Sequence, residues 1–327
     1  MNALQAAMKN YTKNKTEKVL IIDVYNTVFR TIYFAFKEAN LKELNANLEL
    51  AVKSGNQTDI DKCILEIDEA IKTALQYFKY LFVNSVIQYT KKFKPTKLIL
   101  ASDDRNYWRG DIYPEYKAQR KGHREKSDIP YDVFFPEFEK FMGEFKAAFS
   151  NVHFLKVERC EADDIIAVLC KKKFINSDYI NVSTDKDFYQ LKQHPKYQQY
   201  NPISKKMIQH LNPKQELTVK ILTGDGGDNI PGVRAKVGPV TAAKMIKEGL
   251  TTALDTPDMK SNYTRNKQLI DLDMIPLKWE NDILEAYDNS EIKKYNSGNV
   301  WTFLLNHKQK YLAENISVFS EFFKDLN

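Results

Sequence analysis

The sequence predicts an α/β fold in which a mostly parallel central sheet carries helices on both faces. Two observations predict it. Short apolar runs that are typical of buried strands alternate with helical patterns, and this alternation is characteristic of parallel sheets. Two of the four runs also end in aspartate and a third is followed by one two residues later, where a strand would leave the sheet for a loop. The four predicted strands are 19–23, 97–104, 152–157 and 179–183.

Helices are predicted between these strands. Helical signals begin at Asn26, and residues 41–61 predict a helix followed by a loop. From Asp61, apolar residues recur at steps of three and four, which predicts a long amphipathic helix that is capped by Asp61 and reaches Tyr89. Two further helices are predicted at 131–149 and 162–173.

After Pro213 the pattern changes to helices and turns. We therefore expect a polar N-terminal tail at 1–18, an α/β core at 19–212 and a helical region at 213–327. The tail lacks the apolar centre of a secretory signal. Because no apolar run approaches the ~20 residues that span a bilayer, we expect no membrane contact.

Composition and charge narrow the function classes. The chain has 327 residues and a net charge of +6, and its three cysteines form no C-x-x-C pair. Neither a disulfide framework nor a zinc site is predicted, and a reducing cytosol fits. Residues 105–126 hold seven Lys or Arg against three Asp or Glu, interleaved with aromatic residues. Such a segment suits nucleic acid, and a solvated basic helix face is the alternative.

Acidic side chains gather where the predicted strands end. Because ligand sites of α/β sheets lie at the carboxyl ends of the strands, we expect these acids to converge. Each alone could cap a helix or begin a turn, but together they favour a site for Mg²⁺ or Mn²⁺. Two such ions about 4 Å apart can activate a water and stabilise the leaving oxygen of a phosphodiester. The nine acids are Asp23, Asp103, Glu161, Asp163, Asp164, Asp185, Asp187, Asp225 and Asp228.

Six motifs, taken together, resemble the 5′-nuclease or flap endonuclease superfamily, and within it the T-even-type phage RNase H group. The resemblance covers about residues 19–250 and implies a PIN-like 5′-nuclease fold. It also implies a helical arch or clamp at 105–136 and a helix–three-turn–helix motif in the helical C-terminal region. In chain order the motifs are IIDVYNTVFR, LILASDD, RGDIYPEYKAQR, ERCEADDIIAVL, STDKDFYQL and LTGDGGDNIPGV.

The resemblance further implies an activity. It is that of a structure-specific, divalent-metal-dependent 5′→3′ exonuclease and flap endonuclease with RNase H activity. Such an enzyme hydrolyses phosphodiester bonds near the 5′ end of flapped or nicked duplexes and removes RNA primers in DNA replication. Two Mg²⁺ ions are implied, for which Mn²⁺ would substitute. The tighter site would use Asp23, Asp103, Glu161, Asp163 or Asp164, and Asp185, and the second site Asp187, Asp225 and Asp228. We expect Asp103 rather than Asp104, because it is the first acid at its strand end.

Basic residues match the family at several positions. Lys117 matches the active-site lysine, with Arg120 one helical turn on, and a cation there would stabilise charge that develops on the scissile phosphate. Tyr116 could stack on a terminal base, and the alternative is that it packs in the protein core. Arg30 could contact a phosphate of the 5′ strand, and the alternative is a structural salt bridge. The residues expected to contact DNA are Arg30, Arg109, Tyr116, Lys117, Arg120, Gly232, Arg234, Lys236, Gly238, Thr241 and Lys244.

This sequence departs from the family in two places. The hairpin is one residue longer, because RAK replaces Pro-Gly at 234–236, and this affects the K⁺ ion that the family often holds at the hairpin carbonyls. Residues 37–59 are a charged insertion that we expect to be helical and that has no visible chemistry.

The resemblance also implies partners and a setting. The substrates would be branched or nicked DNA and RNA–DNA hybrids, and a single-stranded-DNA-binding protein and a sliding clamp are the implied protein partners. A monomer in the cytoplasm of a phage-infected host cell is expected. A catalytically inactive DNA-junction-binding protein of the same fold is the alternative, and the retained acids and Lys117 argue against it. A PIN-type ribonuclease is a second alternative, which the chain length and the GDGGDN turn argue against.

Overall fold

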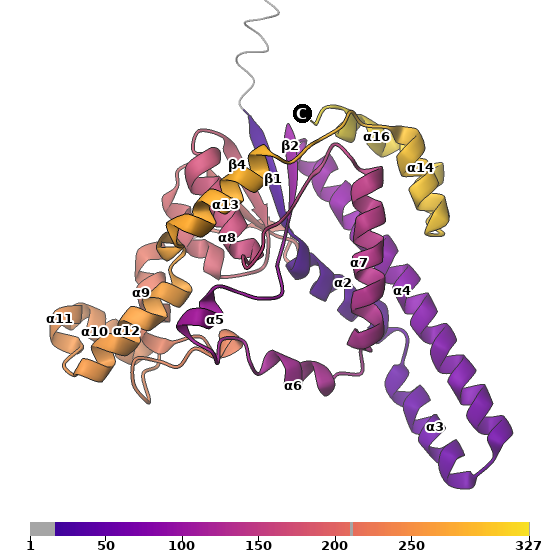
Figure 1. Cartoon of the computed structure of the whole chain (residues 1–327), viewed down its shortest axis with the longest axis horizontal. Helices are drawn as coiled ribbons and strands as arrows, with labels where there is room; N and C mark the ends of the chain where they lie inside the picture. The colour runs from indigo at the N-terminus through magenta and orange to yellow at the C-terminus, as the bar shows by residue number, and fades with distance from the viewer. Residues whose placement is uncertain (1–16, 210–211, 327) are drawn as a thin grey trace, which may run out of the picture.

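A six-stranded sheet forms the centre of the computed structural model, which describes residues 17–209 and 212–326. The strand order is β3-β2-β1-β4-β5-β6, and all neighbours pair in parallel except β5 and β6, which are antiparallel. The predicted α/β fold with a mostly parallel sheet is therefore confirmed (Figure 1). The strands are β1 Lys18–Asp23, β2 Lys97–Ser102, β3 His153–Lys156, β4 Asp178–Val182, β5 Tyr197–Asn201 and β6 Lys206–Met207.

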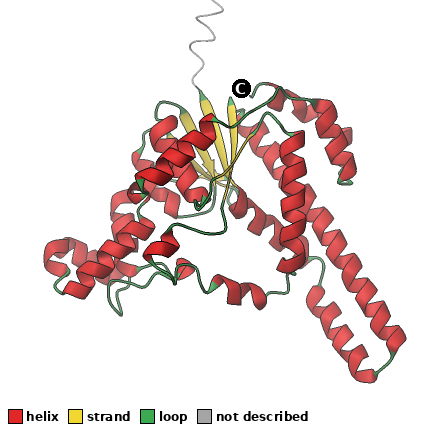
Figure 2. Cartoon of the chain, viewed as in Figure 1, coloured by secondary structure: helices red, strands yellow, loops and turns green. Residues whose placement is uncertain are grey.

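The central strand β1 separates two apolar cores. Successive side chains of a strand point to opposite faces of the sheet. Leu20 and Ile22 accordingly pack into the core on one face, and Val19 and Ile21 into the core on the other. Both faces are therefore covered by helices, as Figure 2 shows, and the strand reads as a continuous apolar run.

One face carries an aromatic-rich layer of helices. The long helix α4, Gln57–Phe93, packs against α7, Tyr131–Ala148. Phe78 and Phe134 meet between them edge to face, with ring centroids 4.8 Å apart, a favourable aromatic geometry. The other helices of this layer are α2 Val24–Lys37, α14 Ser297–Asn306, α15 Lys310–Glu314 and α16 Ile316–Lys324.

The opposite face is covered by shorter elements. α8, Ala162–Val168, lies on it together with α13, Leu277–Asp288. α8 continues into a π-helical turn, η1 Leu169–Lys173, and β4 leads into the 3₁₀ helix η2, Asp187–Gln193. These elements bring the chain after β3 and β4 back across the carboxyl edge of the sheet.

The chain between β2 and α7 runs past the carboxyl edge of the sheet (Figure 1). This crossing segment, residues 103–130, contains two short helices, α5 Arg109–Ile112 and α6 Arg120–Glu125. The region after 212 is helical, as expected, and three of its helices begin with proline, whose fixed φ suits the first helical turn. It contains α9 Pro213–Thr223, η3 Gly226–Asp228, α10 Pro239–Glu248, α11 Leu250–Ala253, α12 Pro257–Ile270 and η4 Leu272–Met274.

The insertion forms a projecting helical hairpin of α3, Leu41–Ser54, and the first turns of α4 (Figure 1). The predicted start of the long helix at Asp61 was wrong. Asn56 is the cap, and its side chain accepts a hydrogen bond from the backbone N of Thr58 at 3.1 Å. Asp61 lies one turn inside, because polar residues between the two candidate caps extend the helix as readily as apolar ones.

Two strands were not predicted. β5 has the polar sequence YQQYN, which carries no apolar run, yet Gln199 on it is fully buried. Its side-chain amide donates hydrogen bonds to the carbonyls of Ser183 and Asp185, at 3.1 and 2.6 Å, so the strand supports the loop after β4.

The described helices include none long and apolar enough to cross a membrane. The division of the chain at residue 212 stays a prediction. The tail predicted at 1–18 lies outside the described residues as far as residue 16.

Candidate active site

Four carboxylates without a Lys or Arg ion pair lie at the carboxyl edge of the sheet. They are Asp23, Asp103, Asp163 and Asp185, called here the unpaired group, and the statement holds for the residues that the structure describes. The sheet register sets β1, β2 and β4 side by side, so these strands end at one level. Asp23 accepts hydrogen bonds from the backbone N of Asn26 at 3.0 Å and from Ser183 Oγ at 3.2 Å.

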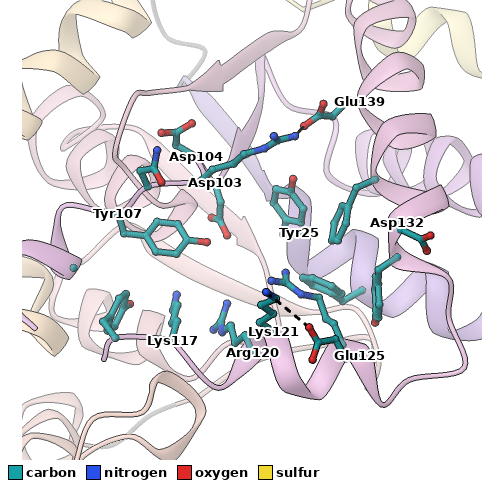
Figure 3. A pocket seen from close by; sticks show the side chains of 18 of the residues that line it. Tyr25, Asp103, Asp104, Tyr107, Lys117, Arg120, Lys121, Glu125, Asp132 and Glu139 are labelled. Carbon is teal, nitrogen blue, oxygen red and sulfur yellow. Dashed lines mark hydrogen bonds and ion pairs between the residues drawn. The ribbon is translucent and has the colours of Figure 1, made fainter. Parts of the chain in front are cut away.

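The two acids that follow β2 point in different directions (Figure 3). Asp103 faces the pocket, and one of its oxygens accepts a hydrogen bond from the backbone N of Ala162 at 2.7 Å. Asp104 accepts from the backbone N of Arg159 at 2.9 Å and lies 3.8 Å from Lys156 Nζ. The geometry therefore places Asp103, and not its neighbour, beside the other acids.

The start of α8 separates three acids that the sequence leaves equivalent. Asp164 is fully buried, and its oxygens accept from Trp108 Nε1 at 3.0 Å, from the Arg109 guanidinium at 2.7 and 3.0 Å, and from the backbone N of Glu161. Asp163 is half-buried and shares the electrostatic environment of Asp23 and Asp185. Of the two alternatives for the tighter metal site, Asp163 is therefore the one with oxygens free of such bonds.

Arg109 lies elsewhere than expected. We predicted a DNA contact, but its side chain is buried, donates to Asp164 and, at 2.8 Å, to Glu161, and reaches the carbonyl of Leu269 at 2.9 Å. A guanidinium so enclosed is not accessible to a phosphate. It instead fixes two acids of α8 against the C-terminal region, because buried charges need paired, hydrogen-bonded partners.

The loop after β4 holds the next two acids close together. The Asp185 side chain accepts from the backbone N of Asp187 at 2.9 Å, and its own backbone N donates to Ser183 Oγ at 3.1 Å. With the contact from Gln199 of β5, this loop has partners on both sides. Asp185 therefore belongs to the unpaired group, while Asp187 is directed towards α9.

A second set of acids, the trio, comprises Asp187, Asp225 and Asp228. Each offers a carboxylate oxygen, and the three oxygens lie within 4.8 Å of one another. The trio differs from the unpaired group in having cationic partners. Lys220 contacts Asp187 and Asp225, and Arg120 lies 2.8 Å from Asp228.

The GDGGDN turn positions two members of the trio. Asp225 and Ile230 form an antiparallel bridge that closes the turn, with the N of each donating to the O of the other at 2.8 Å. Gly224, the first residue of the turn, has a φ of +75°. A Cβ there would meet the carbonyl oxygen of Ile230 at 2.2 Å, so only glycine permits this approach.

Lys117 and Arg120 face the acids from the crossing segment. The ammonium of Lys117 contacts Glu161 and lies 3.7 Å from Asp228, and these acids raise the pKa of Lys117 well above its usual range against the effect of burial. Lys117 has a φ of +58°, and its backbone N donates to the carbonyl of Asp228 at 2.9 Å. Tyr116 is buried, and its hydroxyl donates to Glu161 at 3.0 Å or to Asp228 at 3.1 Å. Tyr116 is therefore packed inside the protein and is not exposed for stacking on a base.

Further contacts tie the crossing segment to the GDGGDN turn. Gln119 donates to the carbonyls of Gly226 and Gly227 at 3.0 and 3.1 Å. Asn229 donates to the carbonyl of Glu115 at 2.8 Å. The position of Lys117 is therefore fixed from the turn that carries Asp228.

An open pocket of about 1180 Å³ adjoins the acids. Asp103 lines it with Lys117 and Arg120, which lie across from it in Figure 3. Aromatic rings of α2 and α7 form another part of its wall, including Tyr25 and Phe29. The combination of cations, aromatic faces and carboxylates is suited to a nucleic-acid strand rather than to an apolar ligand.

Burial and mutual repulsion raise the pKa of three members of the unpaired group, Asp23, Asp103 and Asp163. Burial, followed by Asp103, raises the pKa of Asp23 from 3.8 to about 7. Burial likewise raises the pKa of Asp103 to about 6, and burial with Asp185 raises that of Asp163 well above its usual range. Although burial opposes it, Lys117 lowers the pKa of Glu161 to about 2. An all-oxygen site with this much uncompensated charge fits a hard divalent cation.

These pKa directions predict how Asp23→Asn changes stability without metal. The folded-state pKa of Asp23 lies above the unfolded value, so the unfolded chain loses its proton first and the wild type loses stability as pH rises from about 4 to 7. Asparagine does not titrate. In EDTA, the melting temperature of Asp23→Asn should therefore rise relative to that of the wild type between pH 5 and pH 8.

Thermal melts of both proteins across this range measure the difference directly. Using the difference cancels titrating groups that do not interact with Asp23, including His153, whose pKa burial lowers to about 4. A variant that lost stability relative to the wild type as pH rose would contradict the assignment.

The remaining residues expected at DNA lie in two places. Arg30 on α2 donates a hydrogen bond to Tyr89 Oη at 2.8 Å, which is a structural contact but not the salt bridge given as the alternative, and its phosphate contact stays a prediction. Gly232 approaches its own chain, since a Cβ there would meet the carbonyl oxygens of Thr223 and Leu222 at 3.0 and 3.2 Å. The others lie in α10 or in the turn before it. Arg234, Lys236 and Lys244 are exposed, and Gly238 and Thr241 are half-buried.

Lys220 is the site residue that sequence reasoning missed. It lies on α9, 33 residues after Asp187 and five before Asp225, and neither spacing marks it as a partner. The one signal in the sequence is that this lysine lies in the last turn of a helix that leads directly into a turn with two acids.

The chain is similar to known proteins in its sequence and in its fold. The family described as "5'-3' exonuclease, N-terminal resolvase-like domain" matches residues 18–224. Ribonuclease H of Enterobacteria phage T4 is 27% identical over 289 residues, which cover 81% of this chain and 93% of the T4 protein. Flap endonuclease Xni of Shewanella sp. (strain ANA-3) is 30% identical over 169 residues, covering 49% of this chain and 60% of that protein.

Solved structures with the same fold come from bacteriophage T5. The T5 flap endonuclease, in a complex with DNA and metal ions, matches with a TM-score of 0.57 at 20% identity, over 83% of this chain and 99% of that one. The T5 5′-exonuclease with bound zinc matches with a TM-score of 0.55 at 19% identity, over 82% and 99% of the two chains. At this identity the likeness establishes the fold.

Proposed function

The chain belongs to the 5′–3′ exonuclease family with an N-terminal resolvase-like domain, within the 5′-nuclease superfamily, and is a nuclease; from this we propose its reaction. It hydrolyses phosphodiester bonds near the 5′ end of flapped or nicked duplexes, with divalent metal ions, as a 5′→3′ exonuclease and flap endonuclease with RNase H activity. The observation that carries the proposal is the unpaired group lying beside the trio, with Lys117 facing both.

We propose that the unpaired group and Glu161 hold one Mg²⁺ and the trio a second, with Mn²⁺ as a substitute. Bound there, the two ions would supply activation of a water and stabilisation of the leaving oxygen. The carboxylates of this chain supply the negative charge that the ions need, and the backbone bonds to Asp23, Asp103 and Asp185 fix their orientation. Asp164 and Arg109 hold α8 in place beneath them.

Lys117 and Arg120 act on the substrate. Their cationic groups lie between the acids and the pocket, where a scissile phosphate would enter. A fixed ammonium there stabilises the charge that develops on the phosphate without reorganising during the reaction. The bonds from the GDGGDN turn hold the Lys117 backbone in the left-handed conformation that aims this side chain.

The substrate would lie in two parts of the protein. The 5′ single strand would pass through the pocket beneath the clamp at 105–136, against its cations and aromatic rings. The duplex would rest on the start of α10, where Gly238, Thr241 and the exposed cations Arg234, Lys236 and Lys244 are available to phosphates. A K⁺ ion at the hairpin carbonyls belongs to this proposal.

The name of the T4 relative, Ribonuclease H, supports a role in removing RNA primers during DNA replication. The proposal includes action on RNA–DNA hybrids, a monomeric protein and the cytoplasm of an infected host cell. It also includes contacts with a single-stranded-DNA-binding protein and a sliding clamp.

A duplex with a 5′-labelled flap tests the proposal. Cleavage is expected with Mg²⁺ or Mn²⁺ and not in EDTA, and binding should weaken steeply as salt rises, because phosphate contacts release counterions. A flap that is bound but stays uncut with either ion would instead favour the alternative, an inactive junction-binding protein of the same fold.

A further inference from the structure

Lys220 lies between two acids that come from separate parts of the chain. Its Nζ is 2.7 Å from Asp225 Oδ2 and also contacts Asp187 Oδ1. The pKa of Lys220 is raised, against the effect of burial, by these two acids. About a quarter of its side chain is exposed, at 28%, so the ammonium has a route to solvent.

The two acidic groups of the site therefore differ in how their charge is balanced. Among the described residues, no lysine or arginine pairs with a member of the unpaired group. Every member of the trio has such a partner: Lys220 serves two, and Arg120 serves Asp228. A cation that enters the unpaired group relieves repulsion between carboxylates. A cation that enters the trio is repelled by the positive charge of Lys220.

We propose that Lys220 is the resident counter-cation of the trio and that a divalent ion occupies this site only by displacing its ammonium. The inference deepens the proposed function, on which it rests, by naming Lys220 as the physical cause of weaker ion binding at the trio. It makes Lys220 a positioning residue that keeps Asp187 and Asp225 together in the protein without metal.

The chemistry suits a lysine. An ammonium and a divalent ion cannot share the same carboxylate oxygens at contact distance, because their charges repel. The flexible lysine stem lets the ammonium move away without moving α9, which a guanidinium held in a bidentate pair would resist. Once released, Lys220 would be free to face a substrate phosphate.

Mn²⁺ titration followed by electron paramagnetic resonance and calorimetry tests this. The wild type should show a tight and a weak ion. In Lys220→Met, which keeps the length of the stem and removes the charge, the weak ion should bind about tenfold tighter or more, and the tight ion should be unchanged. Lys220→Arg should stay close to the wild type or bind the weak ion less well.

Lys214→Met is the matched control, since Lys214 is an exposed lysine on the same helix. It should leave both ions unchanged. A second readout is stability: Lys220→Met should melt below the wild type in EDTA, because Asp187 and Asp225 then repel each other, and Mn²⁺ should narrow the gap.

The outcomes separate the inference from the function on which it rests. If the wild type binds two ions and Lys220→Met binds the second with equal or lower affinity, Lys220 is no competitor and the inference fails while the metal-dependent reaction stands. If the wild type binds no Mn²⁺, the proposed function itself fails.

Discussion

Asp185→Asn is expected to reduce flap cleavage to background while leaving DNA binding largely intact. Asp185 belongs to the unpaired group and contributes to the repulsion that raises the pKa of Asp163 and Asp23. Asparagine keeps an oxygen that can accept the 2.9 Å bond from the backbone N of Asp187, so the loop should survive. It removes the negative charge that a divalent ion needs. Single-turnover cleavage and equilibrium binding of the same labelled flap measure the two effects separately.

Asp104→Asn is the matched control for this experiment. It is the same substitution at an acid that faces Lys156 and the backbone of Arg159 instead of the unpaired group. Cleavage by this variant should stay near the wild-type rate. Substantial cutting by Asp185→Asn, or equal losses in the two variants, would contradict the assignment of the site.

Lys117→Ala is expected to lower the single-turnover rate by about a hundredfold to a thousandfold, because it removes a fixed cation that faces the reacting phosphate. The folded state should tolerate the change: Glu161 keeps Arg109 as a partner, and Asp228 keeps Arg120. The backbone strain at a φ of +58° is similar for alanine and lysine. The substitution therefore tests the loss of the side chain rather than a change in the backbone.

Lys121→Ala separates this effect from general attraction of DNA. Lys121 lines the same pocket but is exposed on α6 and pairs with Glu125 at 4.0 Å, away from the acids. Its loss should weaken flap binding modestly without changing the rate at saturation. A Lys117→Ala enzyme whose defect disappeared at saturating flap would show that this lysine acts in binding alone.

Much of the site follows from the chain by local rules. Acids at the ends of β1, β2 and β4 could be placed together from the sequence, because parallel strands in neighbouring positions bring their carboxyl ends to one edge. The two acids of the GDGGDN turn were also picked out from the residues, whereas the role of the lysine in YPEYKAQR came through resemblance. Strand β5 was not predicted, because its polar sequence has no apolar pattern. Its buried Gln199 is accommodated by hydrogen bonds to the loop after β4.

The sequence by itself determined which residue types meet at the carboxyl edge of the sheet. Only the tertiary structure decided how their charges are balanced. Asp163 and Asp164 are neighbours in sequence, yet one joins the unpaired group and the other is enclosed by Arg109 and Trp108. Lys220 reaches Asp187 across 33 residues. The physical reason is that an ion pair depends on the distance between charged atoms in the folded chain, and no local periodicity or spacing encodes that distance.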